Sequence, residues 1–395
     1  MRRLLTLFAV VASFFLVTPA AAQPATDLTV EQLDSIIRDT IDAPTYAGGS
    51  WGIQIANLRT GEVVFSRNAA QNYIPASNVK LYTSAAALER LGPDFRYRTR
   101  VYIDGPIEDG VLKGNVIIRG AGDPTIGGEA QQGDVTQVFR AWADSLRSLG
   151  IRRVAGDIVG DDNYFSDAPF GRGWSWDDTA YAYSAEIGAL SFNLNKINLR
   201  VRGGSSTDAP GQIDWSPLNT DYVRVENRSR TVRRWRDKEE KYDRRRGTNT
   251  LVVGTQVPAG SVEEEELAIT NPTLYTAHVF REVLLREEIS VGGAAVDLDA
   301  VAWSPRYDAP TTRPVASYTS APLSAIVRDL NRESINLYAE MILRTLAVIN
   351  PPDRTEHEPG TSELGAAAIH ETLGAAGVDT SRVEIVDGSG LSRQN

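Results

Sequence analysis

Apolar positions recur along this chain with two spacings, one typical of helices and the other typical of strands. Spacings of three and four residues predict amphipathic helices with an apolar stripe. These helices are predicted at residues 30–40, 81–91, 135–149, 273–287, 323–330 and 337–346. Alternation of apolar and polar residues predicts strands with one buried face. It occurs at residues 51–65, which we interpret as a hairpin, and at 96–101, 111–119, 191–225 and 290–296.

A serine and a lysine stand three residues apart where the second predicted helix begins. Residues three apart share one face of a helix, so the Lys80 amine can reach the Ser77 hydroxyl. A partly desolvated lysine can accept the serine proton and turn the hydroxyl into a nucleophile. Lys80 alone among the five lysines has a serine three residues before it. The alternative is an ordinary helix N-terminus, with Ser77 as its cap and a solvated Lys80.

A second polar pair, Ser334 and Asn336, interrupts the last two helical stripes. A polar break between two helices can present a hydroxyl and an amide to a cleft. The similar pair Ser191 and Asn193 lies in an alternating run that predicts a strand, so we interpret that pair as structural.

These two motifs, in this order, resemble those of the serine acyl-transferases that include penicillin-binding proteins and serine β-lactamases. Four further strings are similar to those of the D-alanyl-D-alanine carboxypeptidase/endopeptidase group, the class C low-molecular-mass penicillin-binding proteins. The strings lie at residues 120–124, 156–162, 334–340 and 387–393. That group carries a large insertion between its first two motifs, and the separation of Lys80 from Ser334 fits it. The resemblance runs from about Leu28 to Asn395.

The resemblance implies an α/β (α+β) fold in which a β-lactamase/transpeptidase-like catalytic domain is split by a large, mainly β insertion. Residues 27–95 and 316–395 would form the catalytic domain. Residues 96–315 would form the insertion, with two small β-rich domains, one of them nested at about residues 165–250.

The resemblance also implies a substrate and a set of roles. Ser77 would be the nucleophile, Lys80 its base, Ser334 a proton relay, and Asn336 a hydrogen-bond partner of the substrate amide. The partners would be peptidoglycan peptide stems ending in D-Ala-D-Ala, with β-lactams as covalent inhibitors, and no cofactor is implied. In this family an aspartate of the insertion can bind the free amine of the stem, and Asp162 stands in the matching string. The alternative for Asp162 is a turn residue.

The chain departs from the family pattern at its third motif. A Lys-Thr-Gly string should follow residues 387–393 by several tens of residues, but none occurs in the sequence, which stops at Asn395. Residues 59–61, Arg-Thr-Gly, are the nearest match, and their place between two alternating runs indicates a hairpin turn. We therefore expect a chain that is truncated and impaired as an enzyme. The alternative is a catalytically inactive periplasmic scaffold that binds the cell wall.

Residues 1–22 have the parts of a secretory signal peptide: two arginines, an apolar run at 4–17, and three alanines at 20–22. The run is shorter than the ~20 residues that span a bilayer, and a retained N-terminal anchor is the alternative. We expect a secreted, periplasmic protein, cleaved near Ala22, with no transmembrane segment after cleavage. Cleavage would change the formal net charge from −10 to −12, and this acidity argues against a nucleic-acid partner.

Residue types narrow the chemistry further. The chain has no cysteine, so no metal site can use thiolates. The three histidines are scattered and no Gly-x-Ser-x-Gly string occurs, which disfavours a metalloenzyme or a Ser-His-Asp hydrolase. We interpret each histidine as structural or solvated. The charged run 228–246 is interpreted as an exposed ribbon, or alternatively as a patch for anionic cell-wall polymer, and the glutamates 263–266 as a solvated edge.

Overall fold

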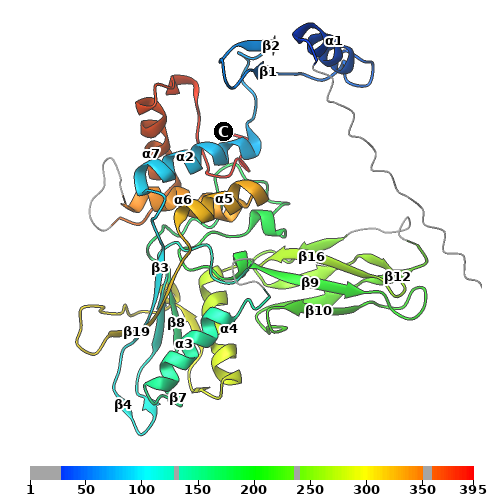
Figure 1. Cartoon of the computed structure of the whole chain (residues 1–395). Coiled ribbons are helices and arrows are strands. Elements are labelled where there is room, and N and C mark those ends of the chain that lie inside the picture. The colour runs from blue at the N-terminus through cyan, green and yellow to red at the C-terminus, as the bar shows by residue number, and fades with distance from the viewer. Residues whose placement is uncertain (1–27, 129–132, 235–240, 350–357) are drawn as a thin grey trace, which may run out of the picture. The chain divides into compact units, whose positions relative to one another are not determined.

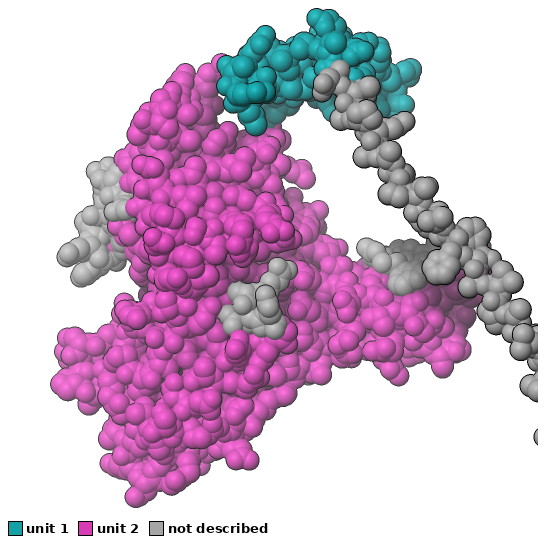
Figure 2. Space-filling view, in the orientation of Figure 1, with its two compact units in different colours: residues 1–73 teal, residues 74–395 magenta. Residues whose placement is uncertain are grey.

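A computed structural model of the protein describes residues 28–128, 133–234, 241–349 and 358–395. The chain forms two compact units, residues 1–73 and residues 74–395 (Figure 2). The predicted signal peptide, residues 1–22, lies outside the described residues. Within the described part of the chain, no helix is long and apolar enough to cross a membrane.

The described part of the first unit, residues 28–73, contains one α-helix and one hairpin. The helix α1 (Val30–Ile41) agrees with the predicted range to within one residue. The strands β1 (Ile53–Ala56) and β2 (Val63–Arg67) pair antiparallel. Gly61 lies between them with a φ of 74°, a left-handed conformation that glycine adopts without strain. Residues 59–61 therefore belong to a hairpin connection, as predicted.

Four helices of the second unit lie together near its C-terminal end (Figure 1). They are α2 (Val79–Leu91), α5 (Leu323–Glu333), α6 (Asn336–Ile349) and α7 (Ser362–Ala375). The helix α6 is buried on nearly every side, because α2, α5 and α7 all contact it. This burial explains why its sequence is mostly apolar rather than amphipathic.

A five-stranded sheet lies at the other end of the same unit (Figure 1). Its strand order is β18–β8–β6–β3–β19. The strands are β3 (Arg98–Ile103), β6 (Val116–Arg119), β8 (Ile158–Asp161), β18 (Ala295–Asp297) and β19 (Arg313–Thr319). The first three strands in that order run parallel, while β3 is antiparallel to both of its neighbours. The helices α3 (Gln137–Ser148) and α4 (Pro272–Arg286) contact this sheet and bury an aromatic cluster of Phe139, Trp142 and Phe280.

The other described strands of the second unit form four smaller sheets, and most of these strands lie between α3 and α4 in sequence. One sheet joins β9 (Lys196–Arg202), β10 (Gln212–Ser216) and β16 (Val262–Ala268); a second joins β11 (Arg224–Asn227), β13 (Tyr242–Arg244) and β14 (Thr250–Val253). Another pairs β12 (Arg230–Val232) with β15 (Gln256–Pro258), and the last joins β4 (Ile107–Glu108), β5 (Val111–Leu112), β7 (Arg153–Val154) and β17 (Ser290–Val291). The mixed α/β class is thus confirmed, and the exact domain boundaries stay a prediction.

Two strand predictions were wrong. Residues 191–193 are not a strand but lead into a 3₁₀ turn, η4 (Asn193–Asn195), whose three residues all have positive φ. The Ser191 hydroxyl and the Asn193 amide are buried and donate to backbone carbonyls, so their structural role holds. The predicted strand 290–296 is divided by two glycines into β17 and β18, which belong to different sheets.

The solvated interpretation of the charged runs was wrong at two positions. Glu263 is buried in β16, where the hydroxyls of Tyr242 and Thr255 donate to its carboxylate. Arg244 is also buried, and its Nη2 donates to the Thr179 carbonyl at 2.8 Å. Both charges are tolerated inside because they have hydrogen-bond partners. Residues 235–240 of the first run lie outside the described residues.

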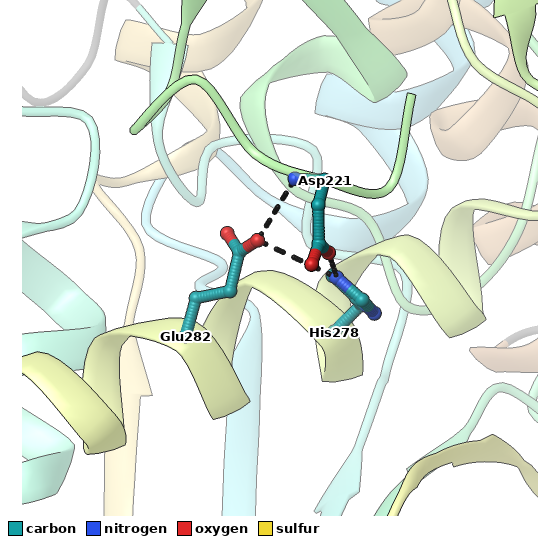
Figure 3. A group of neighbouring side chains, drawn as sticks. All are labelled: Asp221, His278 and Glu282. Carbon is teal, nitrogen blue, oxygen red and sulfur yellow. Dashed lines mark hydrogen bonds and ion pairs between the residues drawn. The ribbon is translucent and has the colours of Figure 1, made fainter. Parts of the chain in front are cut away.

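One ring nitrogen of His278, on α4, faces the carboxylates of Asp221 and Glu282 (Figure 3). Its Nε2 is hydrogen-bonded to Asp221 and lies 3.4 Å from Glu282 Oε1, which also accepts the backbone N–H of Asp221 at 3.0 Å. One nitrogen of His278 and one oxygen each of Asp221 and Glu282 are close enough together to bind a metal ion, but the hydrogen bonds among these residues account for the arrangement. The group ties the segment before β11 to α4, in agreement with a structural His278. His357 lies outside the described residues.

We predict that His278 stabilises the fold in a pH-dependent way. Burial lowers its pKa, but the hydrogen bonds and charges of Glu282 and Asp221 raise that pKa by more. A group whose folded-state pKa is raised contributes stability that is complete below its unfolded-state pKa and is lost as the pH rises through the folded-state value. We therefore expect His278→Gln to lower the free energy of unfolding by less than about 1 kcal/mol at pH 5.5.

The difference between wild type and variant should shrink towards pH 8.5, as measured by urea unfolding at both pH values. His370→Gln, a histidine outside this group, is the control. A difference that is the same at both pH values would show that the ion pairs of His278 do not contribute.

Candidate active site

Ser77 is exposed and lies in a short 3₁₀ turn, η1 (Ala76–Asn78), directly before α2. Ala76 has a φ of 48°, a conformation that costs energy for a residue with a Cβ atom. Gly390 packs against this turn so closely that a Cβ atom there would lie 1.7 Å from the Ala76 carbonyl oxygen. The segment around Gly390 therefore supports the backbone that carries Ser77.

Lys80 is buried beneath Ser77, with 2% of its surface exposed. Its Nζ lies 3.1 Å from Ser77 Oγ, 2.6 Å from Asn336 Oδ1 and 2.8 Å from the Ser389 carbonyl oxygen. Burial lowers the pKa of Lys80 to about 8, against the opposing charges of Glu340 and Asp387. A lysine with this pKa has an appreciable neutral fraction near neutral pH.

Ser334 and Asn336 come to the same place from the junction of α5 and α6. Ser334 ends α5 with a φ of 57°, and its Oγ donates to Ser77 Oγ at 3.1 Å. The Asn336 Nδ2 donates to the Tyr183 carbonyl at 2.7 Å, which turns its Oδ1 towards Lys80. A pocket of about 230 Å³ opens beside these residues, and Tyr183 lies in its wall. The structure thus brings four of the predicted site residues together, and two of them, Ser334 and Asn336, line the pocket.

Asp162 lies elsewhere, at the carboxyl end of β8. Its Oδ2 accepts from Thr273 Oγ1 at 2.6 Å, and Asp297 and Asp299 are its neighbours. Burial raises the pKa of Asp162 to about 7, although the Thr273 hydrogen bond opposes this. Within the described residues, Asp162 makes no hydrogen bond to any of the four residues above. Its role in binding an amine stays a prediction.

Two residues near Lys80 were not singled out from the sequence. Glu340 is fully buried on α6, and its Oε1 accepts the backbone N–H groups of Gly388 and Ser389 at 3.0 and 2.9 Å. Ser389 in turn offers its carbonyl oxygen to Lys80. One signal was available: a glutamate inside a mostly apolar helix, with Arg344 four residues later, needs buried partners.

Known proteins resemble this chain over most of its length. The profile of the D-Ala-D-Ala carboxypeptidase 3 (S13) family matches residues 30–395. The D-alanyl-D-alanine carboxypeptidase of Actinomadura sp. (strain R39) is 31% identical over 378 residues, which are 92% of this chain and 64% of that protein. The D-alanyl-D-alanine carboxypeptidase DacB of Haemophilus influenzae is 24% identical over 356 residues, 88% of this chain and 68% of that protein. This chain therefore spans about two thirds of the length of these relatives.

Solved structures agree with the fold. Penicillin binding protein 4 from Haemophilus influenzae superposes with a TM-score of 0.70 at 21% identity, over 87% of this chain and 71% of that one. A structure of the same protein complexed with a novel β-lactam gives a TM-score of 0.65. At this identity the likeness concerns the fold alone, and it confirms the transpeptidase-like class expected from the motifs. Because the family profile extends over nearly all of the described residues, the chain belongs to the D-Ala-D-Ala carboxypeptidase 3 (S13) family.

Proposed function

We propose that this protein is a serine-type D-Ala-D-Ala carboxypeptidase/endopeptidase that cleaves peptide stems and cross-links of peptidoglycan through an acyl-enzyme. β-Lactams would acylate the same serine. The observation that carries the proposal is an exposed Ser77 hydroxyl within 3.1 Å of both a buried lysine amine and a second serine hydroxyl. The family, and relatives named D-alanyl-D-alanine carboxypeptidases, support the substrate class. The signal-like residues 1–22 support a secreted, periplasmic location.

The neighbours of Lys80 determine what its amine can do. A neutral amine has two N–H groups and one lone pair. The Asn336 Oδ1 and the Ser389 carbonyl oxygen can only accept hydrogen bonds, so they take both N–H groups. The lone pair is then left for the Ser77 hydroxyl, the third neighbour. This arrangement makes neutral Lys80 a general base for Ser77.

The reaction then follows from these contacts. Ser77 Oγ attacks the carbonyl carbon of the penultimate D-Ala while its proton moves to Lys80, and backbone N–H groups stabilise the oxyanion. Ser334, in contact with Ser77 Oγ, relays the proton taken up by Lys80 to the leaving amine as the C–N bond breaks, so that Lys80 is neutral again. Water hydrolyses the resulting ester and releases the shortened stem. The Asn336 amide uses its oxygen for Lys80 and its nitrogen for the Tyr183 carbonyl. These contacts support a role in orienting Lys80, and its hydrogen bond to the substrate stays a prediction.

The first prediction concerns the nucleophile. Labelled penicillin should attach covalently to the protein, slowly in a chain that lacks the Lys-Thr-Gly string, and Ser77→Ala should abolish this labelling because it removes the attacking oxygen. Labelling is measured on a denaturing gel and the modified residue is located by mass spectrometry. Ser148→Ala, an exposed serine of α3, should label like wild type. A wild-type protein that does not label would instead favour the inactive wall-binding alternative.

The second prediction concerns the base. Because burial lowers the pKa of Lys80 to about 8, the rate of penicillin acylation should rise with pH and reach half its maximum near pH 8. At pH 7 only roughly a tenth of Lys80 would be neutral. Lys80→Arg should abolish the reaction at every pH, since a guanidinium does not lose its proton in this range. A flat profile between pH 6 and 9 in wild type would argue against Lys80 as the base.

A further inference from the structure

We propose that Glu340 is a positioning residue for Lys80. It holds the Gly388–Ser389 backbone so that the Ser389 carbonyl oxygen occupies one N–H group of the lysine amine. The inference rests on the proposed function, because the direction of the amine matters only if Lys80 is the base for Ser77.

Glu340 is bound to the loop by a complete set of contacts. It lies one helical turn after Asn336 on α6, with 0% of its surface exposed. Besides the two N–H groups on Oε1, its Oε2 accepts from Arg344 Nη1 at 3.2 Å. A buried carboxylate is costly unless donors surround it, and each of these three partners is a donor. Burial and then the charge of Asp387 raise the pKa of this carboxyl, while Arg344 and the Ser389 N–H group oppose the rise. The ionised carboxylate is the form that the three donors satisfy.

The other side of the same loop faces α2. The Gly388 carbonyl accepts from Thr83 Oγ1 at 2.8 Å, and the Ser389 carbonyl accepts from Lys80 Nζ at 2.8 Å. Gly388 and Ser389, two consecutive residues, are thus held through their N–H groups by α6 and through their carbonyls by α2. A Cβ atom on Gly388 would lie 2.6 Å from the Ala339 carbonyl oxygen, so the loop lies directly against α6. Glu340 thus holds Ser389, which carries the carbonyl that binds Lys80, in position from the α6 side, and Thr83 holds the preceding residue from the α2 side.

This position decides where the lone pair of the amine points. If the Ser389 carbonyl moved away, the second N–H group of neutral Lys80 would turn to Ser77 Oγ as its nearest acceptor. The lone pair would then face away from the proton that it must accept. Glu340 also acts through its charge, which raises the pKa of Lys80 against the effect of burial.

Glu340→Gln tests both effects. It keeps the size of the side chain but removes the charge and places an amide donor against Arg344. The readout is the pH profile of acylation by labelled penicillin. We expect the limiting rate to fall by roughly 10-fold or more, because a misdirected base is costly. We expect the midpoint to move down by about one pH unit, because the carboxylate charge no longer favours the ammonium. Glu371→Gln, which removes the surface partner of Arg90, should change neither quantity.

Thr83→Val is a second, independent variant. It removes only the hydroxyl that holds the Gly388 carbonyl, so we expect a fall of roughly 3-fold or more in the limiting rate with an unchanged midpoint. A general loss of stability would not shift the midpoint of the pH profile. A midpoint that falls in Glu340→Gln but stays unchanged in Thr83→Val would therefore reflect the loss of the Glu340 charge.

The outcomes separate this inference from the proposed function. If the wild type is labelled and a folded Glu340→Gln variant has the same pH profile, the proposed role of Glu340 is wrong and the proposed function stands. A wild type that is never labelled would overturn both. If Glu340→Gln does not fold, Thr83→Val decides, and an unchanged limiting rate in that variant would overturn the inference.

Discussion

The site depends on one buried amine whose hydrogen-bond partners come from distant parts of the chain. Burial makes the ammonium form of Lys80 expensive, while two fixed acceptors and the Ser77 hydroxyl leave its neutral form fully satisfied. The acceptors stand 256 and 309 residues from Lys80 in sequence. The chemistry therefore requires that three separate segments meet within hydrogen-bond distance.

The fold brings these segments together around α6. This helix begins at Asn336, contacts α2 through its apolar side chains, and carries Glu340 one turn further along. The loop at residues 387–392 is organised by the buried carboxylate of Asp387, which accepts from the backbone N–H groups of Gly390 and Ser392 and from Trp174 Nε1. Hydrogen bonds among the polar groups at the centre of the helical cluster thus fix the positions of the loop and of the turn that carries Ser77.

The residues between α2 and α5 reach the site from two loop segments: Trp174 donates to the Asp387 carboxylate, and Tyr183, in a 3₁₀ turn, contacts Asn336. The Tyr183 carbonyl accepts from the Asn336 amide and so orients it, and Tyr183 lies in the wall of the adjacent pocket. The residues between the two motifs are therefore not only a spacer, because they fix the direction of a group that binds Lys80.

Several features could be predicted from the sequence because they depend on local geometry. A spacing of three residues places Ser77 and Lys80 together in any helical turn, and apolar periodicity located helices such as α1 and α4 to within about a residue. Only the tertiary structure decided the rest. The alternation of polar and apolar residues at 191–193 belongs to a buried turn rather than a strand, because all three side chains are buried and the two polar ones donate to backbone carbonyls.

The partners of Lys80 show the same limit most clearly. Side-chain types near Lys80 indicate a possible base, but one of its acceptors is the backbone carbonyl of Ser389, which any residue has. Likewise, Glu340 is an ordinary helix residue in the sequence. It holds the final loop only because two N–H groups from a distant part of the chain donate to it. The sequence by itself determined which residues can react. The packing of α2, α6 and the final loop decided which way the reacting amine points, because that direction depends on contacts between segments that local spacing does not relate.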